Sequence, residues 1–257
     1  MPESDRKYVQ EDARRVAIIG AGRIARAVIA GIEAGEAPGF GVCAVLRRNP
    51  VPSGTTGLRV VAGIADLLES APDLIIEAAG PDALREHGTK ALAAADLWTI
   101  SGGALADREF EKQIEAVGLS SGHRLRLLPG AIGGLDAVAA AACDGDADIR
   151  VEVGTTATKA DAIPHFVGTA REVVSRFRGV NVVAAIALAG PGLDATRVAY
   201  HPPVKSARRL FTVGIESIHG RYTVTGSPYS TETGGATVVA ASILAALRRS
   251  RLVISAG

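Results

Sequence analysis

The sequence is poor in several residue types, and each shortage narrows what the protein can be. Only 4% of its 257 residues are aromatic, so Ala, Val, Leu and Ile must fill most of the core. The 28 basic residues nearly balance the 27 acidic ones and form no basic tract, which argues against nucleic acid or a membrane surface as a partner. No apolar run reaches the roughly 18 residues needed to span a bilayer, so we expect no membrane segment.

Cysteine is also scarce. Cys43 and Cys143 lie in apolar stretches without metal-ligand spacing, so we expect buried free thiols and no metal site. Such thiols are typical of a reducing cytoplasm. Residues 1–14 are polar and mixed in charge, which is not the pattern of a secretory signal, and we expect them to form a polar tail. The sequence therefore predicts a cytoplasmic protein.

The most informative stretch is an apolar run over 16–19 that enters the segment IGAGRIA, residues 19–25. Between a strand and a helix, Gly-x-Gly-x-x-Ala is typical of dinucleotide binding. Gly20 would allow the tight turn, and Gly22 would let a pyrophosphate approach bare backbone. The N–H groups at the start of the following helix would bind the anion. The alternative is a glycine turn in some other α/β protein.

Two arginines follow the second apolar run, 42–46. Enzymes that use NAD usually have an acid at this strand end, where it binds the ribose hydroxyls. Arg47 and Arg48 instead offer forked donors suited to a phosphate, so they favour NADP over NAD as the cofactor. The alternative is that Arg47 and Arg48 are solvated charges of a loop and bind no phosphate, and this alternative stays open for Arg48 in particular.

The order of apolar segments predicts two domains. Strand and helix patterns alternate over 15–128, which is typical of a Rossmann-type, doubly wound parallel sheet in an α/β protein. Residues 129–234 contain strand patterns that we expect to pair antiparallel in a smaller α+β domain for substrate binding and dimerisation. Residues 235–257 contain a further helix, which would return to the cofactor domain.

At this point the chain resembles the L-aspartate dehydrogenase family from about residue 15 onward. The most specific segment is LLPGAIGGLDA at 127–137, and the other similar segments are 19–24, 76–80, 100–105, 168–172, 181–184, 188–190 and 192–194. The resemblance implies oxidation of L-aspartate to iminosuccinate with NAD or NADP. In amino-acid metabolism the imine hydrolyses to oxaloacetate and ammonia, or it enters NAD biosynthesis.

The resemblance also implies which residues contact the cofactor. The corresponding positions are Gly20, Gly22, Arg23, Ile24, Ala79, Gly80, Ser101, Gly102 and Gly103. Ala131 and Asn181 match positions that flank the nicotinamide and the substrate. From its own context, Ala131 could instead form only a tight turn, and Asn181 could be only a helix N-cap.

The chain departs from the family in its second half. Family members carry Asn-x-His on a strand, where the imidazole is a general base or activates water, but the matching residues 205–211 contain no histidine. A family loop with a Lys-Pro pair is shortened here to about 156–165, which leaves Lys159. Residues 232–235 replace the family's Asn-Pro-Lys-Thr. Substrate handling has therefore been rebuilt or lost.

Three residues are candidates for the vacated catalytic role. His201 could act as the base, or it could be a loop histidine that caps a turn. Lys159 would serve only if burial lowered its pKa. Arg209, whose guanidinium cannot act as a base, could bind a substrate carboxylate, or it could belong to a charged edge strand.

The sequence therefore predicts an NAD(P)-dependent oxidoreductase, a homodimer that prefers NADP and acts on a small amino or oxo acid, with aspartate as the best single substrate. Two alternatives stay open. One is a reductase of a different imino or oxo acid, and the other is a catalytically silent NADP(H)-binding protein.

Overall fold

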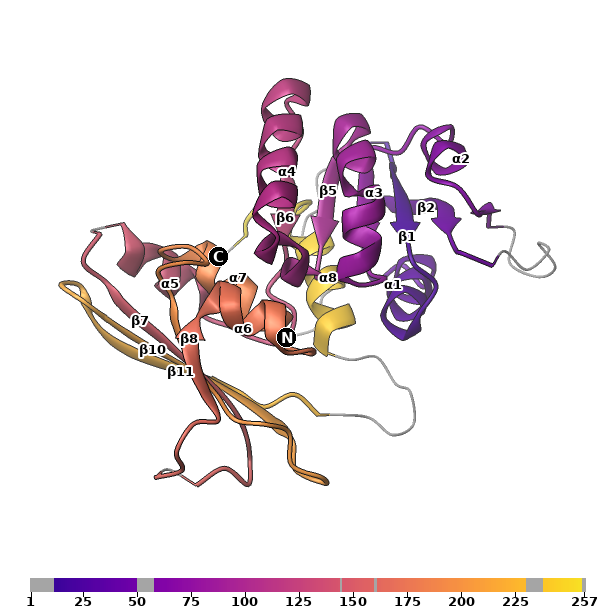
Figure 1. Cartoon of the computed structure of the whole chain (residues 1–257). Coiled ribbons are helices and arrows are strands. Elements are labelled where there is room, and N and C mark those ends of the chain that lie inside the picture. Colours follow the sequence, from indigo (N-terminus) through magenta and orange to yellow (C-terminus); the bar gives the residue numbers. More distant parts are fainter. Residues whose placement is uncertain (1–11, 50–57, 144, 160, 230–237, 256–257) are drawn as a thin grey trace. The chain divides into compact units, whose positions relative to one another are not determined.

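The computed structural model describes residues 12–49, 58–143, 145–159, 161–229 and 238–255 (Figure 1). The chain divides into two compact units: residues 1–101, 109–128 and 234–257 form the first, and residues 102–108 and 129–233 form the second. Within the described ranges, no helix has both the length and the apolar character to cross a membrane.

The first unit contains a six-stranded, fully parallel sheet. Its spatial order is β3 (Val60–Val61), β2 (Phe40–Leu46), β1 (Arg14–Ile19), β4 (Leu74–Glu77), β5 (Asp96–Thr99) and β6 (Leu125–Leu127). The strand order reverses at β1, which makes the carboxyl end of β1 the switch point where ligands bind in such sheets. The predicted Rossmann-type sheet is confirmed, although β3 was not predicted and β1 begins inside the predicted tail.

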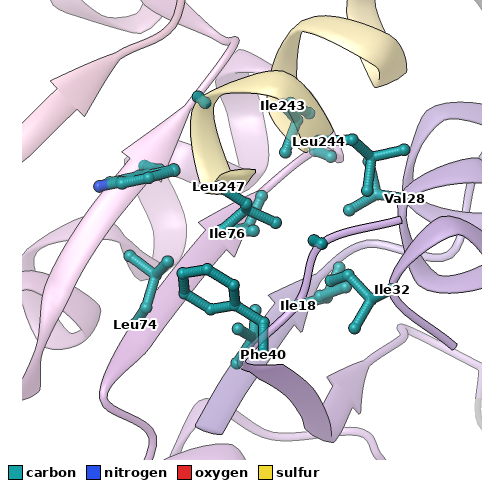
Figure 2. Close-up of a cluster of buried hydrophobic side chains, with 14 of the residues drawn as sticks. Ile18, Val28, Ile32, Phe40, Leu74, Ile76, Ile243, Leu244 and Leu247 are labelled. Carbon is teal, nitrogen blue, oxygen red and sulfur yellow. The ribbon is translucent and has the colours of Figure 1, made fainter. Parts of the chain in front are cut away.

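A buried apolar cluster joins this sheet to two helices from opposite ends of the chain, α1 (Arg23–Glu33) and α8 (Val238–Arg249). Figure 2 shows Ile243, Leu244 and Leu247 of α8 turned toward Ile76 of β4 and Val28 of α1. Full burial of an aliphatic side chain of this size contributes about 1.5–3 kcal/mol. The last helix therefore completes the core of the first unit.

The remaining helices of the first unit are α2 (Ile64–Leu68), α3 (Pro81–Ala94) and α4 (Arg108–Ser121), of which α4 starts in a residue assigned to the second unit. Pro81 occupies the first turn of α3, where a missing N–H costs nothing. A Cβ at Gly88 of α3 would lie 3.3 Å from the ring of Phe110, so α3 and α4 are in close contact.

The second unit contains a five-stranded mixed sheet in the order β11 (Gly220–Gly226), β10 (Arg209–Ser217), β7 (Asp148–Thr155), β9 (Arg197–Tyr200) and β8 (Phe166–Thr169). β10 pairs antiparallel with β11, as predicted for 207–217 and 221–226, whereas β9 runs parallel to β7, a pairing that was not predicted. Between the two strands the chain passes through β8, α6 (Ala170–Arg176) and α7 (Asn181–Ala189), and a crossover of this length lets a strand return in the same direction.

One face of this sheet is apolar and buried. Along β7, Ile149, Val151 and Val153 are buried, whereas Arg150 and Glu152 between them are exposed. The helices of the unit, including α5 (Leu135–Ala142), contribute buried apolar side chains such as Val138, Val173 and Val183. The opposite face carries the charged side chains.

Both cysteines are free, but neither is buried as predicted. Cys143 is exposed just after α5, and Cys43 is half-buried, with its Sγ 3.4 Å from the Ser70 hydroxyl. Cys143 lies beyond the buried residues Val138 and Ala141 of α5, and Cys43 lies in the half-buried middle of β2, before its buried residues 44–46.

A short 3-10 helix, η2 (Gly102–Ala106), follows β5 and belongs to the second unit, whereas the predicted boundaries placed it in the first. Arg171 of α6, whose side chain is only 12% exposed, donates to the carbonyl oxygens of Leu105 and Ala106 at 2.9 and 3.0 Å. Its guanidinium also forms a forked pair with Asp194, at 2.9 and 3.0 Å. Asp194 thus holds the Arg171 side chain, which in turn holds the segment that carries Gly102 and Gly103.

The hydrogen bond from Arg171, reinforced by the charges of Arg171 and Arg108, holds the pKa of Asp194 below its ordinary value of 3.8. The folded protein therefore binds fewer protons here than the unfolded chain. Below the ordinary pKa the unfolded chain takes up a proton first, and the stabilisation is lost as the pH falls through the folded-state pKa.

We expect Asp194→Asn to lower the melting temperature by a few degrees at pH 7, because the ionised pair is fully formed there. The difference from the wild type should shrink as the pH falls from about 4 toward 2. Thermal unfolding followed by circular dichroism measures both effects, with the exposed Asp146→Asn as the matched control. A difference independent of pH would contradict a role for the charge.

Candidate functional site

A cavity of about 510 Å³ lies at the carboxyl ends of β1, β2 and β4 in the first unit. It brings together six of the predicted cofactor residues: Gly20, Gly22, Arg47, Arg48, Ala79 and Gly80. The rest of its lining includes Asn49, Asp82, Glu86 and His87, of which His87 was not predicted. Arg23 and Ile24 open α1 directly after the lining residue Gly22.

The glycines of the first turn have the geometry that a bound dinucleotide requires. Gly20 has φ +124°, and a Cβ there would lie 3.1 Å from the carbonyl carbon and oxygen of Ala78. A Cβ at Gly22 would meet no atom within 4 Å, so this residue borders open space. Gly22 is the N-cap of α1, and no side chain caps this helix end. The N–H groups of the first turn are therefore suited to a pyrophosphate.

Arg47 and Arg48 are exposed where β2 ends, and both line the cavity. The Arg47 amide donates to the carbonyl of Val61 at 2.9 Å, which fixes its backbone beside β3. In the described part of the chain, neither guanidinium has a hydrogen-bond or ion-pair partner, whereas Asp82 of the same cavity is paired with Arg85. Two uncompensated guanidinium groups can bind a 2′-phosphate.

The turns after β4 and β5 depend on two residues that sequence reasoning missed. Glu77, the last residue of β4, is fully buried, and its Oε1 accepts from the amides of Ala79 and Gly80 at 2.6 and 2.7 Å. Its Oε2 accepts from the Thr99 hydroxyl at 2.5 Å, and Thr99 Oγ1 accepts from the Ser101 amide at 2.9 Å. The sequence did offer one signal for Glu77, because an acidic residue directly follows the apolar residues of this strand.

Ser101 adds a polar atom that suits a ligand. The residue is 1% exposed, and within the described chain its Oγ has no hydrogen-bond partner. A buried hydroxyl without a partner is costly, so its persistence fits a site that a ligand completes. The unobstructed Gly22, the guanidinium groups of Arg47 and Arg48 and the unpartnered Ser101 hydroxyl together fit a nicotinamide dinucleotide.

In the second unit, three of the predicted residues lie at the same edge of the sheet, the one formed by the carboxyl ends of β7 and β9. β7 ends at Thr155 on this edge, β10 begins there at Arg209, and His201 directly follows β9. Arg209 donates to the His201 carbonyl at 3.2 Å. Ala131 packs on the same edge, because a Cβ at Gly226, which ends β11, would lie 3.1 Å from its carbonyl oxygen.

The His201 side chain is nearly buried and faces a carboxylate. Its Nε2 lies 3.5 Å from Oε1 of Glu152 on β7, and its amide donates to the Val153 carbonyl at 2.7 Å. A carboxylate beside an imidazole can orient the ring. Sequence reasoning missed Glu152, because nothing in an alternating strand indicates which polar residue will meet a distant histidine.

The other candidates near this edge are less enclosed. Lys159 is exposed in the turn after β7, which removes the burial on which its use as a base depends. Arg208, which precedes Arg209 and was considered with it as a ligand for a substrate carboxylate, is also exposed, with its guanidinium 4.6 Å from the centre of the Tyr229 ring. Residues 232–235, which replace a family motif, lie outside the described residues.

Asn181 links α7 to η2. Its Oδ1 accepts from the Gly103 amide at 3.2 Å, and its NH2 group has no partner among the described residues. Val180 occupies the N-cap position of α7, so the alternative that Asn181 only caps this helix is wrong. The structure therefore brings together Asn181 and the predicted residues Gly102 and Gly103.

Two protein families match successive parts of the chain, and the second match extends into α8 of the first unit. Residues 20–128 match the family described as "Homoserine dehydrogenase, NAD binding domain", and residues 141–250 match "Aspartate dehydrogenase, C-terminal". The fold is similar to the crystal structure of aspartate dehydrogenase from Thermotoga maritima, with a TM-score of 0.70 and 22% identity over 95% of this chain and 99% of that one.

Two relatives cover nearly the whole sequence. L-aspartate dehydrogenase of Ruegeria pomeroyi is 34% identical over 94% of both chains. L-aspartate dehydrogenase 2 of Bordetella bronchiseptica is 32% identical over 91% of this chain and 96% of its own. With this identity along both units and an intact dinucleotide turn, the chain belongs to the L-aspartate dehydrogenase family of NAD(P)-dependent oxidoreductases.

Proposed function

We propose that this protein interconverts L-aspartate and iminosuccinate, and thereby oxaloacetate and ammonia, with NADP(H) preferred over NAD(H). The complete phosphate turn at Gly20–Gly22, in a chain homologous to aspartate dehydrogenases over its whole length, carries the proposal. We further propose a homodimer that pairs through the exposed sheet face carrying Arg150 and Glu152.

In this proposal the first unit holds the cofactor. The first N–H groups of α1 bind the pyrophosphate, Arg47 and Arg48 bind the 2′-phosphate, and Ser101 Oγ donates to or accepts from the dinucleotide. When bound, the cofactor accepts the hydride that leaves the substrate Cα. The preference for NADP follows from two cationic groups without a carboxylate partner in the described chain.

In the same proposal the second unit binds the substrate carboxylate and accepts the proton that the substrate nitrogen releases. Oxidation of an amine to an imine releases a proton from nitrogen, and an imidazole accepts protons readily near neutral pH. His201, oriented by Glu152, takes this role in place of the missing family histidine. Arg209, whose guanidinium lies 5.4 Å from the centre of the Tyr200 ring, binds a substrate carboxylate.

A different substrate is the second candidate, because the shortened loop and the absent Asn-x-His alter the substrate half specifically. A reductase of another imino or oxo acid would need no activated water. Its carboxylate could still bind Arg209. This candidate is favoured if the protein binds NADPH yet leaves oxaloacetate and ammonium unchanged.

Reductive amination tests the proposed activity directly. Purified protein should oxidise NADPH in the presence of oxaloacetate and ammonium, and it should oxidise NADH more slowly, as followed by absorbance. Omission of ammonium is the control, since a simple oxo-acid reductase would not need it. Absence of turnover with both cofactors, despite measurable NADPH binding, would overturn the assignment of aspartate.

Arg47→Ala tests the cofactor preference. Loss of a charge-assisted hydrogen bond to the 2′-phosphate should raise the Kd for NADPH by roughly tenfold and leave that for NADH nearly unchanged. Arg59→Ala is the matched control, because Arg59 is exposed and paired with Glu69 outside the cavity. Equal effects on both cofactors would show that Arg47 does not recognise the 2′-phosphate.

His201→Asn tests the base. We expect kcat to fall by about 10²-fold to 10⁴-fold with unchanged NADPH affinity, the usual range for a lost general base. Glu152→Gln should lower kcat less, since the imidazole remains. His219→Asn, in the turn after β10, is the control. A His201 variant with wild-type kcat would place the base elsewhere and make Lys159→Ala the next variant to examine.

A further inference from the structure

Glu77 is a fully buried carboxylate, and in the described chain it forms no ion pair with a basic side chain. Burial of a carboxylate is costly unless hydrogen bonds compensate it. Among the described residues the compensation comes from the amides of Ala79 and Gly80, in the turn after β4, and from the hydroxyl of Thr99, the last residue of β5. A group this costly, at the ligand-binding edge of the sheet, calls for a functional explanation.

The first two bonds determine the turn between β4 and α3. Gly80 is the N-cap of α3 and has φ +120°, a conformation that favours glycine. No side chain caps α3 from the Gly80 position, so Glu77 satisfies donors that would otherwise lack a partner. These amides are therefore engaged, and the pyrophosphate is left to the N–H groups of α1.

The third bond extends to the next strand. Glu77 and Thr99 are directly paired between β4 and β5, so their side chains lie side by side. Thr99 donates to Glu77 and accepts from the Ser101 amide with the same oxygen. The Ser101 backbone, and with it the direction of the unpartnered Oγ, is thereby set by the carboxylate.

The same turn also supports the phosphate turn. A Cβ at Gly20 would lie 3.1 Å from the Cβ of Ala79 and from the carbonyl of Ala78. These two alanines directly follow Glu77, so a change in their backbone would displace the surface on which Gly20 rests. One carboxylate thus connects the three turns that carry Gly20, Gly80 and Ser101.

We propose that Glu77 is a positioning residue for the dinucleotide and that Thr99 extends its effect to Ser101. The proposal rests on the proposed function only in that the chain binds NADPH or NADH. Glu77 acts through the three turns that it aligns, so its contribution appears in cofactor affinity. Binding of the oxo acid does not depend on it.

The test compares Thr99→Val, which removes only the hydroxyl, with Thr99→Ser, which keeps it. Thr196→Val is the matched control: Thr196 is also fully buried, and its hydroxyl donates to the Gly192 carbonyl at 2.9 Å in the second unit. Fluorescence titration of the full-length protein measures the Kd for NADPH, and thermal unfolding measures stability. Glu77→Gln is the fourth variant, since its amide keeps the acceptor for Ala79 and Gly80.

We expect Thr99→Val to raise the Kd for NADPH about tenfold or more, the effect of leaving buried partners unsatisfied. Thr99→Ser should restore it, and Glu77→Gln should give a smaller rise. Thr196→Val should lower the melting temperature without changing the Kd. In reductive amination, Thr99→Val should raise the KM for NADPH and leave the KM for oxaloacetate unchanged.

Folded Thr99→Val with the wild-type Kd would overturn the proposal, and so would an equal loss of affinity in Thr196→Val. If the Glu77 variant fails to fold, the Kd values of Thr99→Val and Thr99→Ser still test the proposal. A wild-type protein that binds neither NADPH nor NADH would overturn the proposed function and this inference together. Wild-type binding with an unaffected Thr99→Val would overturn this inference alone.

Discussion

The close approach of the turn after β1 to the turn after β4 is the constraint on which the cofactor half depends. It places Gly20 against the carbonyl of Ala78, at a distance and a φ value that exclude other residues. Because the two strands are neighbours at the point where the strand order reverses, both turns border one cavity. The two glycine turns and the side chains of Arg47 and Arg48 line this cavity, which lies where such sheets bind a dinucleotide.

The two units have diverged to different extents from the family pattern. The first keeps the glycine turn and the small residues that give a ligand access to backbone. The second has the mixed sheet and its helices, but residues 205–211, where the resemblance implies a histidine, contain none. At the same sheet edge, however, His201 and Glu152 form an imidazole–carboxylate pair beside Arg209. The cofactor-binding turn and these candidate substrate-binding residues therefore lie in separate units.

The features that could be predicted from the sequence are those that interactions between nearby residues determine. The strand–turn–helix at Gly20 and the alternation along β7 were readable because their periodicity lies within a few residues. The parallel direction of β9, the assignment of η2 to the second unit, and the partners of Glu77 and His201 were not predicted. Apart from the bonds of Glu77 to Ala79 and Gly80, these features depend on contacts between residues 22 to 66 positions apart, for which one sequence offers no signal.

The position of α8 also bears on the order in which the chain can fold during synthesis. Val28 and Ile32 of α1 emerge from the ribosome early, yet the side chains that cover them lie in residues 238–249. The first unit therefore keeps an apolar surface exposed until residues 238–249 have been made. Residues 129–233 form a nearly continuous second unit and can become compact before that. The second unit can therefore fold before the first unit is complete, and the uncovered apolar surface of the first unit is open to aggregation until then.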